Sequence, residues 1–224
     1  MSWESEKKIF YDFIIQNNVI GFFNEPITLK SGRKSYWYIN WRNIAEDVFL
    51  FDILTDFLIS YVKHLKLKPD CFYGVPEGAT KLGVITQYKW AISDNNLTPG
   101  KFILSMGRAK PKEHGDPKDK FFLGNPKGRV IIVEDTTTTG GSLLKTIDNL
   151  LDFNVNIIAA IGLTNRNELR DDGRTVEEAI KQKNIQYFAM SDALDLLPNL
   201  NPNETIKSHI KNYFKKYGSK EIKF

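Results

Sequence analysis

One stretch decides the fold of this 224-residue chain: VIIVEDTTTTGGS, from Val130 to Ser142. Its apolar half predicts a strand that ends in two acidic residues, followed by a turn rich in hydroxyls and glycine and then by a helix. In a parallel sheet, ligands bind at the carboxyl ends of strands. Such a turn aims backbone N–H groups at an anion, and the helix N-terminus adds a partial positive charge. The stretch therefore predicts a phosphate-binding turn.

Glu134 and Asp135 stand directly before this turn, where two carboxylates would repel a phosphate. They are explained if the ligand also carries ribose hydroxyls, which carboxylates accept, and if positive charge develops on the sugar ring. The alternative is a helix cap flanked by solvated acids. Paired acids, four threonines and paired glycines in this order are hard to explain by capping alone.

Short apolar runs alternate with helical patterns on both sides of this stretch, which favours a parallel sheet covered by helices on both faces. The runs predicted as strands are 70–73, 102–104, 130–133, 157–161 and 187–190. The predicted helices are 78–91, 142–152, 175–184 and 191–197. Thr175 and Glu178 form a capping-box pattern at the start of one of them.

Residues 1–45 precede the alternation and are expected to form a cap within a single domain of residues 1–224. They contain a predicted amphipathic helix at 4–18, and two strands around a glycine turn are predicted within 22–40. Another helix is predicted at 46–63. The segment 107–128 is a long charged loop, and a loop of this length in a compact domain is typically functional or disordered. The tail, 203–224, predicts a basic surface helix with a frayed end.

Composition sets limits on function. The 31 basic and 27 acidic residues give a net charge of +4, so the charge does not demand a nucleic-acid partner. Cys71 is the only cysteine, which excludes an intrachain disulfide, and it is expected to be a buried thiol in a strand. No apolar run approaches the length of a membrane span, and the amino terminus lacks an apolar signal region. We therefore expect a cytoplasmic protein without membrane contact.

The stretch 130–142 resembles the signature of type I phosphoribosyltransferases, which bind 5-phosphoribosyl 1-diphosphate (PRPP). The resemblance implies that family's fold, a central parallel sheet flanked by helices with an N-terminal hood. It also implies that Glu134 and Asp135 bind the ribose hydroxyls. The remaining residues would hold the 5-phosphate: Thr136, Thr137, Thr138, Thr139, Gly140, Gly141 and Ser142.

The segment RAKPKEHGD, residues 108–116, resembles the mobile catalytic loop of the orotate phosphoribosyltransferases. Arg108, Lys112 and His114 match that pattern and would bind PRPP, with Lys112 and His114 acting in catalysis together with Asp135. A basic loop can neutralise a departing diphosphate and exclude water. A following Gly115 also matches. Ala109 stands where the family commonly has lysine, and Lys110 is a candidate replacement. Taken alone, the run would be a solvated basic loop.

The segment TLKSGRKS, residues 28–35, resembles another part of the same family, in which the lysine contacts base and diphosphate. By this resemblance, Lys30 binds both substrates. Tyr38 and Ile39 fall where the family places a pair that packs on orotate, and Thr138 is also assigned to the orotate side. An exposed hairpin is the alternative explanation of this segment.

Two further segments complete the resemblance. The loop after the strand at 70–73 is similar to the family's diphosphate-binding loop, with Pro76, Glu77, Gly78, Ala79 and Thr80 as its residues. The roles of Glu77 and of Lys81, a phosphate ligand or a surface lysine, stay open. Arg166 falls where the family binds the orotate carboxylate with an arginine, the side chain whose planar fork suits a carboxylate. A surface arginine at a strand end is the alternative.

Five segments in the family's order imply an enzyme that makes orotidine 5′-phosphate from orotate and PRPP in pyrimidine synthesis. Mg²⁺ would be bound mainly through PRPP oxygens, with no direct protein ligand expected. The resemblance also implies a homodimer with shared active sites. Two alternatives remain: a type I phosphoribosyltransferase for another base, and a PRPP-sensing regulatory protein that binds nucleic acid.

Overall fold

The computed structural model describes residues 3–108, 110–114 and 120–224. Its helices and strands, in chain order, are α1 (Trp3–Gln16), β1 (Ile20–Thr28), β2 (Lys34–Ile39), α2 (Arg42–Glu46), α3 (Val48–His64), β3 (Cys71–Gly74), α4 (Thr80–Ile92), β4 (Met106–Gly107), β5 (Phe122–Leu123), β6 (Arg129–Thr137), α5 (Gly141–Asp152), β7 (Asn156–Asn165), α6 (Val176–Lys181), β8 (Gln186–Asp192), α7 (Ala193–Asn199) and α8 (Glu204–Tyr217).

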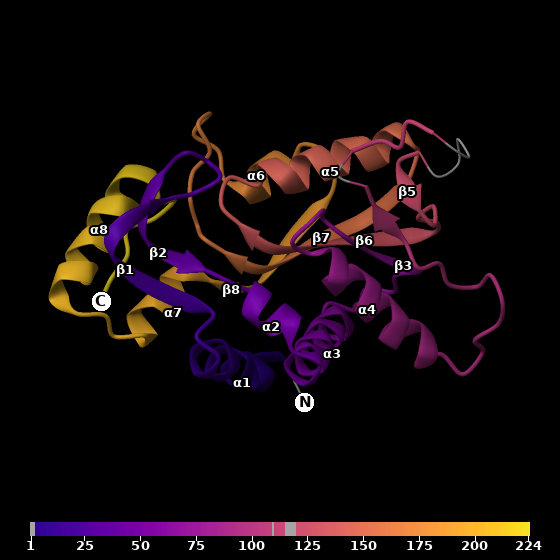
Figure 1. Cartoon of the computed structure of the whole chain (residues 1–224), viewed down its shortest axis with the longest axis horizontal. Helices are drawn as coiled ribbons and strands as arrows, with labels where there is room; N and C mark the ends of the chain where they lie inside the picture. Colours follow the sequence, from indigo (N-terminus) through magenta and orange to yellow (C-terminus); the bar gives the residue numbers. More distant parts are fainter. Residues whose placement is uncertain (1–2, 109, 115–119) are drawn as a thin grey trace.

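The predicted parallel sheet is confirmed. Four strands pair in the order β3-β6-β7-β8, and every neighbouring pair is parallel. Figure 1 shows α3 and α4 on one side of this sheet and α5 and α6 on the other. Because both faces are covered, the strands are apolar without alternation; Val130 to Val133 are all fully buried. Cys71 is buried in β3, as expected, and desolvation raises the pKa of its thiol to about 12.

The strand predicted at 102–104 is wrong. Leu104 is exposed, and the segment passes beside β3 with the Ile103 carbonyl 3.9 Å from the Cys71 sulfur, without joining the sheet. Residues 105–107 pair instead with residues 122–124, toward the carboxyl end of the 107–128 segment. Met106 and Gly107 pair with Leu123 and Phe122, and the Ser105 hydroxyl donates to the Gly124 carbonyl.

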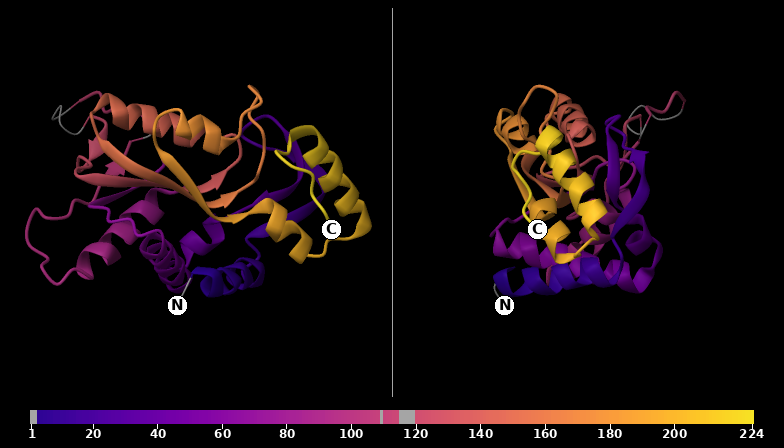
Figure 2. Two further views of the ribbon diagram at one scale, coloured as in Figure 1. Left: turned by 180° about the vertical axis from the view of Figure 1, so that it is seen from behind. Right: turned by 90° about the vertical axis from the view of Figure 1, so that its left-hand side faces the viewer.

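The amino-terminal region forms a second unit at one end of the sheet. Strands β1 and β2 make a two-stranded antiparallel sheet, as predicted, and α1 packs against α3 and β8. The hairpin lies beside α8, at the opposite end of the molecule from β5 (Figures 1 and 2). The last helix therefore belongs to the same end of the molecule as the amino-terminal hairpin.

The helix predicted in the tail is confirmed, but its description as a surface helix is wrong because one face is packed against the core. Helix α8 buries Ile206, Ile210, Tyr213 and Phe214, and the Phe214 ring stacks on Trp37 of β2 at 6.1 Å. The chain beyond it is also anchored, because the Ser219 N–H donates to the Asn167 carbonyl. The lysines within α8 lie on the outer face of an amphipathic helix, and Lys220 and Lys223 follow its end.

Candidate active site

The predicted phosphate turn lies at the carboxyl end of β6, but the strand is longer than the sequence indicates. Pairing with β7 continues through Glu134 and Thr136 to Thr137, so the two acids lie within the strand. The turn is correspondingly short, and α5 begins at Gly141. Gly140 has a φ of 68°, a left-handed conformation, and a Cβ there would lie 2.9 Å from a Val176 methyl. Glycine is therefore required at this position.

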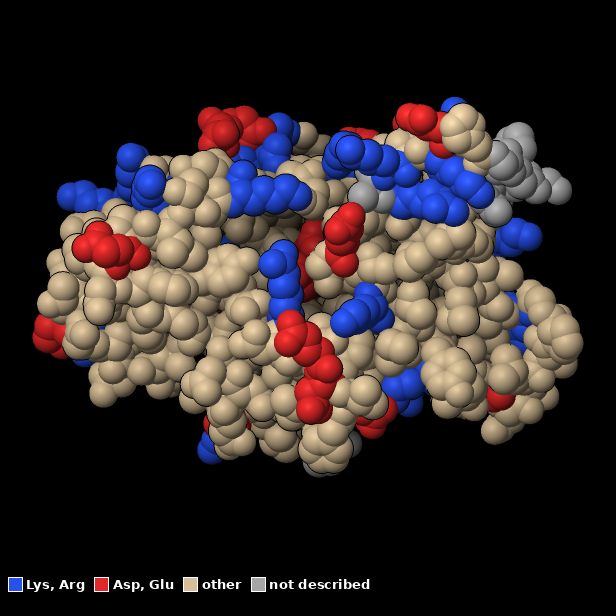
Figure 3. All heavy atoms as spheres, in the orientation of Figure 1, with Lys and Arg blue, Asp and Glu red and all other residues tan. Residues whose placement is uncertain are grey.

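The two carboxylates differ in environment. Glu134 is 7% exposed, and the Asp135 N–H donates to its Oε1 at 3.3 Å. Burial, followed by the charge of Asp135, raises the pKa of Glu134 well above its usual value, while the charge of Lys30 lowers it. Asp135 is half-buried and accepts from the Thr136 N–H. Figure 3 shows a hollow near the centre of the face seen in that view, with acidic side chains in and below it and basic ones along its upper rim and beside it.

The predicted diphosphate loop packs against the acids. Its backbone approaches so closely that a Cβ on Gly78 would lie 2.7 Å from the Asp135 Oδ2. The loop begins with a cis peptide between Pro76 and Glu77. Within it, Glu77 is exposed and Ala79 is fully buried. The Lys81 ammonium donates to the Ala45 carbonyl at 3.1 Å, which ties it to α2.

The amino-terminal hairpin reaches the phosphate turn through its tip. The Gly32 N–H donates to the Leu29 carbonyl, and the tight turn projects Lys30 outward. The Lys30 ammonium donates to the Ser142 hydroxyl at 2.9 Å, in the first turn of α5. A residue from the cap segment and a residue from the central motif are thus brought together, as one site requires.

Arg166 is not the surface residue of the alternative explanation, because it is only 1% exposed. Its Nε donates to Glu168 at 2.6 Å, its Nη2 donates to Ser35, and its guanidinium stacks 3.5 Å over the Trp37 ring. Arg33 donates to the second oxygen of the Glu168 carboxylate. Among the described residues, Nη1 of Arg166 is buried without a hydrogen-bond partner. A buried guanidinium with one unsatisfied N–H group is suited to bind an anion.

Tyr38 and Ile39 lie at the end of β2, on opposite faces of the hairpin. Ile39 is 3% exposed and belongs to the core, on the same face as Trp37, whereas Tyr38 is half-buried. Thr138 lies directly after β6, in the phosphate turn.

The predicted catalytic loop leaves the sheet as two antiparallel arms. The Arg108 N–H donates to the Phe121 carbonyl, and the Lys112 N–H donates to the Lys120 carbonyl. The side chains of Lys110, Lys112 and His114 are exposed. Ala109 and the segment from Gly115 to Asp119 lie outside the described residues.

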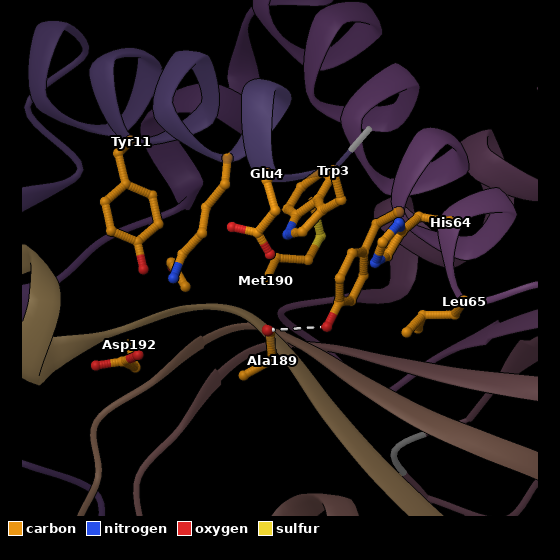
Figure 4. Close-up of a pocket in the computed structure, with 11 residues that line it drawn as sticks. Trp3, Glu4, Tyr11, His64, Leu65, Ala189, Met190 and Asp192 are labelled. Carbon is orange, nitrogen blue, oxygen red and sulfur yellow. Dashed lines mark hydrogen bonds between the residues drawn. The ribbon is translucent and has the colours of Figure 1, made fainter. Parts of the chain in front are cut away.

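A different pocket, of about 240 Å³, lies between α1, the end of α3 and the edge strand β8. Figure 4 shows Trp3, Glu4 and Tyr11 facing Ala189 and Asp192 across it. The Tyr61 hydroxyl closes one side by donating to the Ala189 carbonyl. None of the residues predicted for the active site lines this pocket, so it is a separate feature of the fold.

Sequence reasoning missed several residues that shape the site. Glu168 and Arg33 form the buried charge cluster with Arg166, and Trp37 and Tyr213 supply its aromatic walls. The spacing of Arg166 and Glu168, two residues apart after a strand, was the available signal. The pairing of Glu168 with Arg33, which lies 135 residues away, leaves no local pattern in the sequence.

Both the sequence and the fold are similar to those of known proteins, although no family profile matches the sequence. An orotate phosphoribosyltransferase of Methanosphaera stadtmanae is 31% identical over 174 residues, which cover 77% of this chain and 85% of that protein. The orotate phosphoribosyltransferase structure of Francisella tularensis superposes with a TM-score of 0.68 at 22% identity, covering 94% of this chain and all of that one. A Mycobacterium tuberculosis orotate phosphoribosyltransferase in complex with PRPP gives 0.58 at 18% identity, over 85% of this chain and 98% of that one.

The parallel sheet, with a glycine-containing turn after β6 and the amino-terminal hairpin at one end, is therefore the type I phosphoribosyltransferase fold. The sequence identity defines a narrower family than the fold does. This chain belongs to the orotate phosphoribosyltransferase family. In the described part of the chain, no helix is long and apolar enough to cross a membrane.

Proposed function

We propose that this protein transfers the 5-phosphoribosyl group of PRPP to orotate, giving orotidine 5′-phosphate and diphosphate in pyrimidine synthesis. The observation that carries the substrate assignment is Arg166, buried beside the hairpin with an unsatisfied Nη1. Orotate carries a carboxylate that satisfies this group, whereas purine bases do not. We also propose a cytoplasmic location for the enzyme.

The phosphate turn and the acids would hold PRPP from two sides. Backbone N–H groups of residues 138–142, before and at the start of α5, would bind the 5-phosphate, because the Thr136 N–H donates to Asp135. Glu134 and Asp135 would accept the ribose hydroxyls and stabilise positive charge on the ring as the bond to diphosphate breaks. Burial and the charge of Asp135 raise the pKa of Glu134 and favour its protonated form in the ligand-free protein, and the charge of Lys30 opposes this shift.

The departing diphosphate needs positive charge. Lys30 reaches the phosphate turn from the hairpin, and the N–H groups of Glu77 and Gly78 would face the diphosphate, since those of Ala79 and Thr80 donate to backbone carbonyls. Lys112 and His114, on the arms that leave the sheet, would close over the diphosphate and exclude water. Orotate N1 would then bond to C1 of the ribose, with Arg166 fixing the base through its carboxylate.

The side chains of the candidate site supply only some of the oxygen ligands that Mg²⁺ requires. The described residues contain no group of three or more His, Cys, Asp or Glu side chains placed to hold a metal ion. Mg²⁺ favours about six oxygen ligands and retains several waters. We therefore propose that PRPP and water oxygens hold the ion, with Glu134 and Asp135 near it through the ribose. The ion would neutralise diphosphate charge.

We also propose a homodimer with shared active sites. Helix α4 buries one face through Leu82, Thr86 and Ala91, yet Ile85, Tyr88 and Ile92 form an exposed apolar stripe on another. Val48 and Phe49, at the start of the neighbouring α3, are also exposed. A helix that is apolar on both faces is expected to be covered on both. A second copy of the chain would cover this surface.

The activity is tested by following the ultraviolet absorbance of orotate. The purified protein should consume orotate only when PRPP and Mg²⁺ are both present, with diphosphate formed in equal amount. Hypoxanthine and adenine should not react. Turnover of a purine base without turnover of orotate would assign the enzyme to another base. Salt-sensitive binding of nucleic acid without turnover would favour the regulatory alternative.

A further inference from the structure

The carbonyl groups of the phosphate turn need hydrogen-bond partners that the 130–142 motif does not supply by itself. If N–H groups of the turn point toward a phosphate, the carbonyls on the other side of the same peptides point away from it and need their own partners. The segment after β7 supplies two of them. The Arg166 N–H donates to the Thr137 carbonyl at 2.9 Å, and Nη1 of Arg170 donates to the Thr139 carbonyl.

The Thr139 carbonyl also sets the direction of the next N–H group. Across a trans peptide, the carbonyl oxygen and the following N–H point in opposite directions. Because the Thr139 carbonyl points toward Arg170, the Gly140 N–H points to the opposite side of the turn. This is the side on which we propose that the phosphate binds. A Cβ at Gly140 would lie 2.9 Å from a Val176 methyl, so Val176 packs close to this peptide.

The loop around Arg170 is compact, although Nε of Arg170 is buried without a hydrogen-bond partner among the described residues. Its side chain is 22% exposed, with Asp172 Oδ2 3.5 Å from its Nε. Its own backbone closes a tight turn, because the Arg170 N–H donates to the Arg174 carbonyl and the Gly173 N–H donates to the Arg170 carbonyl. Arg174 pairs with Asp172 and Gln182 and makes no described contact with the phosphate turn.

We infer that Arg170 is a positioning residue for PRPP, fixing the Thr139–Gly140 peptide so that its N–H binds the 5-phosphate. The inference rests on the proposed function for its substrate. The segment from Arg166 to Arg170 would then serve both halves of the reaction, with Arg166 at the base and Arg170 behind the phosphate turn.

Steady-state kinetics of Arg170→Ala, Arg170→Lys and Arg174→Ala test the inference. Arg170→Ala should raise the KM for PRPP about tenfold, the scale of one charge-assisted hydrogen bond, and leave the KM for orotate within about twofold. Arg170→Lys should recover part of the loss, because an ammonium can still donate to Thr139. Arg174→Ala removes the same charge from the same loop and should behave like wild type.

Binding of ribose 5-phosphate, measured by calorimetry, gives a readout without turnover. It should weaken in Arg170→Ala and stay unchanged in Arg174→Ala. If the wild type does not consume orotate, the proposed function fails while this binding still tests Arg170. Equal effects on both substrates, or equal effects of the Arg170 and Arg174 changes, overturn the inference. Should Arg170→Ala fail to fold, the Arg170→Lys variant decides by the same criteria.

Discussion

The Lys30 ammonium lies 2.9 Å from the Ser142 hydroxyl, although 112 residues separate them in sequence. This contact joins the tip of the amino-terminal hairpin to the first turn of α5. The same lysine is close enough to Glu134 for its charge to lower the pKa of that buried acid. One side chain from the cap therefore acts on both the hydroxyl and the carboxylate parts of the candidate site.

Lys30→Ala should lower kcat/KM for PRPP by about 10- to 100-fold, the effect of losing one charge-assisted hydrogen bond of roughly 1.5–3 kcal/mol. Thermal unfolding should change little, because the lysine is exposed. Lys34→Ala, which alters an exposed lysine of the same hairpin, is the matched control. Equal activity of the two variants would show that Lys30 has no role in the site.

Glu134→Gln should stabilise the ligand-free protein at neutral pH while reducing activity. The pKa of Glu134 is raised in the folded state above its ordinary value of 4.5, so the folded protein binds the proton more tightly than the unfolded chain. The stability from this group is complete below pH 4.5 and is lost as pH rises through the raised pKa. The variant should gain up to about 1.4 kcal/mol per pH unit across that window.

Urea unfolding of both proteins between pH 4 and pH 8 measures this difference. The two curves should nearly coincide at the acid end and separate toward neutral pH. A difference that is constant with pH would mean that Glu134 does not titrate abnormally in the folded protein.

Gly78→Ala should reduce activity by displacing the Asp135 carboxylate, for which we propose a catalytic role. The new Cβ would lie 2.7 Å from the Asp135 Oδ2, and the carboxylate must rotate away because the loop backbone is the less flexible partner. We expect a loss of at least about tenfold in kcat/KM. Gly21→Ala, where a Cβ meets nothing within 4 Å, is the control. A fully active Gly78→Ala enzyme would argue that Asp135 does not work in its present orientation.

Arg166→Lys should raise the KM for orotate much more than the KM for PRPP. Lysine keeps the positive charge near Glu168 but loses the planar fork and the Nη1 group, a difference of roughly 1.5–3 kcal/mol in a charge-assisted contact. Initial rates at varied concentrations of each substrate separate the two constants. If both constants rise in parallel, Arg166 supports the whole site and does not bind the carboxylate.

The sequence predicted the central features well because they are local. The run 130–142 carries strand, turn and helix signals within thirteen residues, and a glycine with positive φ stands where the turn needs it. The end of β6 was misplaced because Glu134 to Thr137 are polar, although β7 still pairs with them. The charge cluster of Arg33, Arg166 and Glu168 and the packing of α8 on Trp37 are contacts between distant segments, which no local pattern contains.

The shared-site dimer predicts complementation between two inactive variants. Lys112→Ala should remove charge neutralisation of the diphosphate, and Asp135→Asn should damage the ribose site, so each homodimer should be nearly inactive. If the loop of one subunit closes over the site of the other, a mixed dimer has one site with both defects and one with neither. Random exchange makes half of the dimers mixed, so activity should approach about a quarter of wild type. Absence of any recovery after verified subunit exchange would show that the loop serves the site of its own chain.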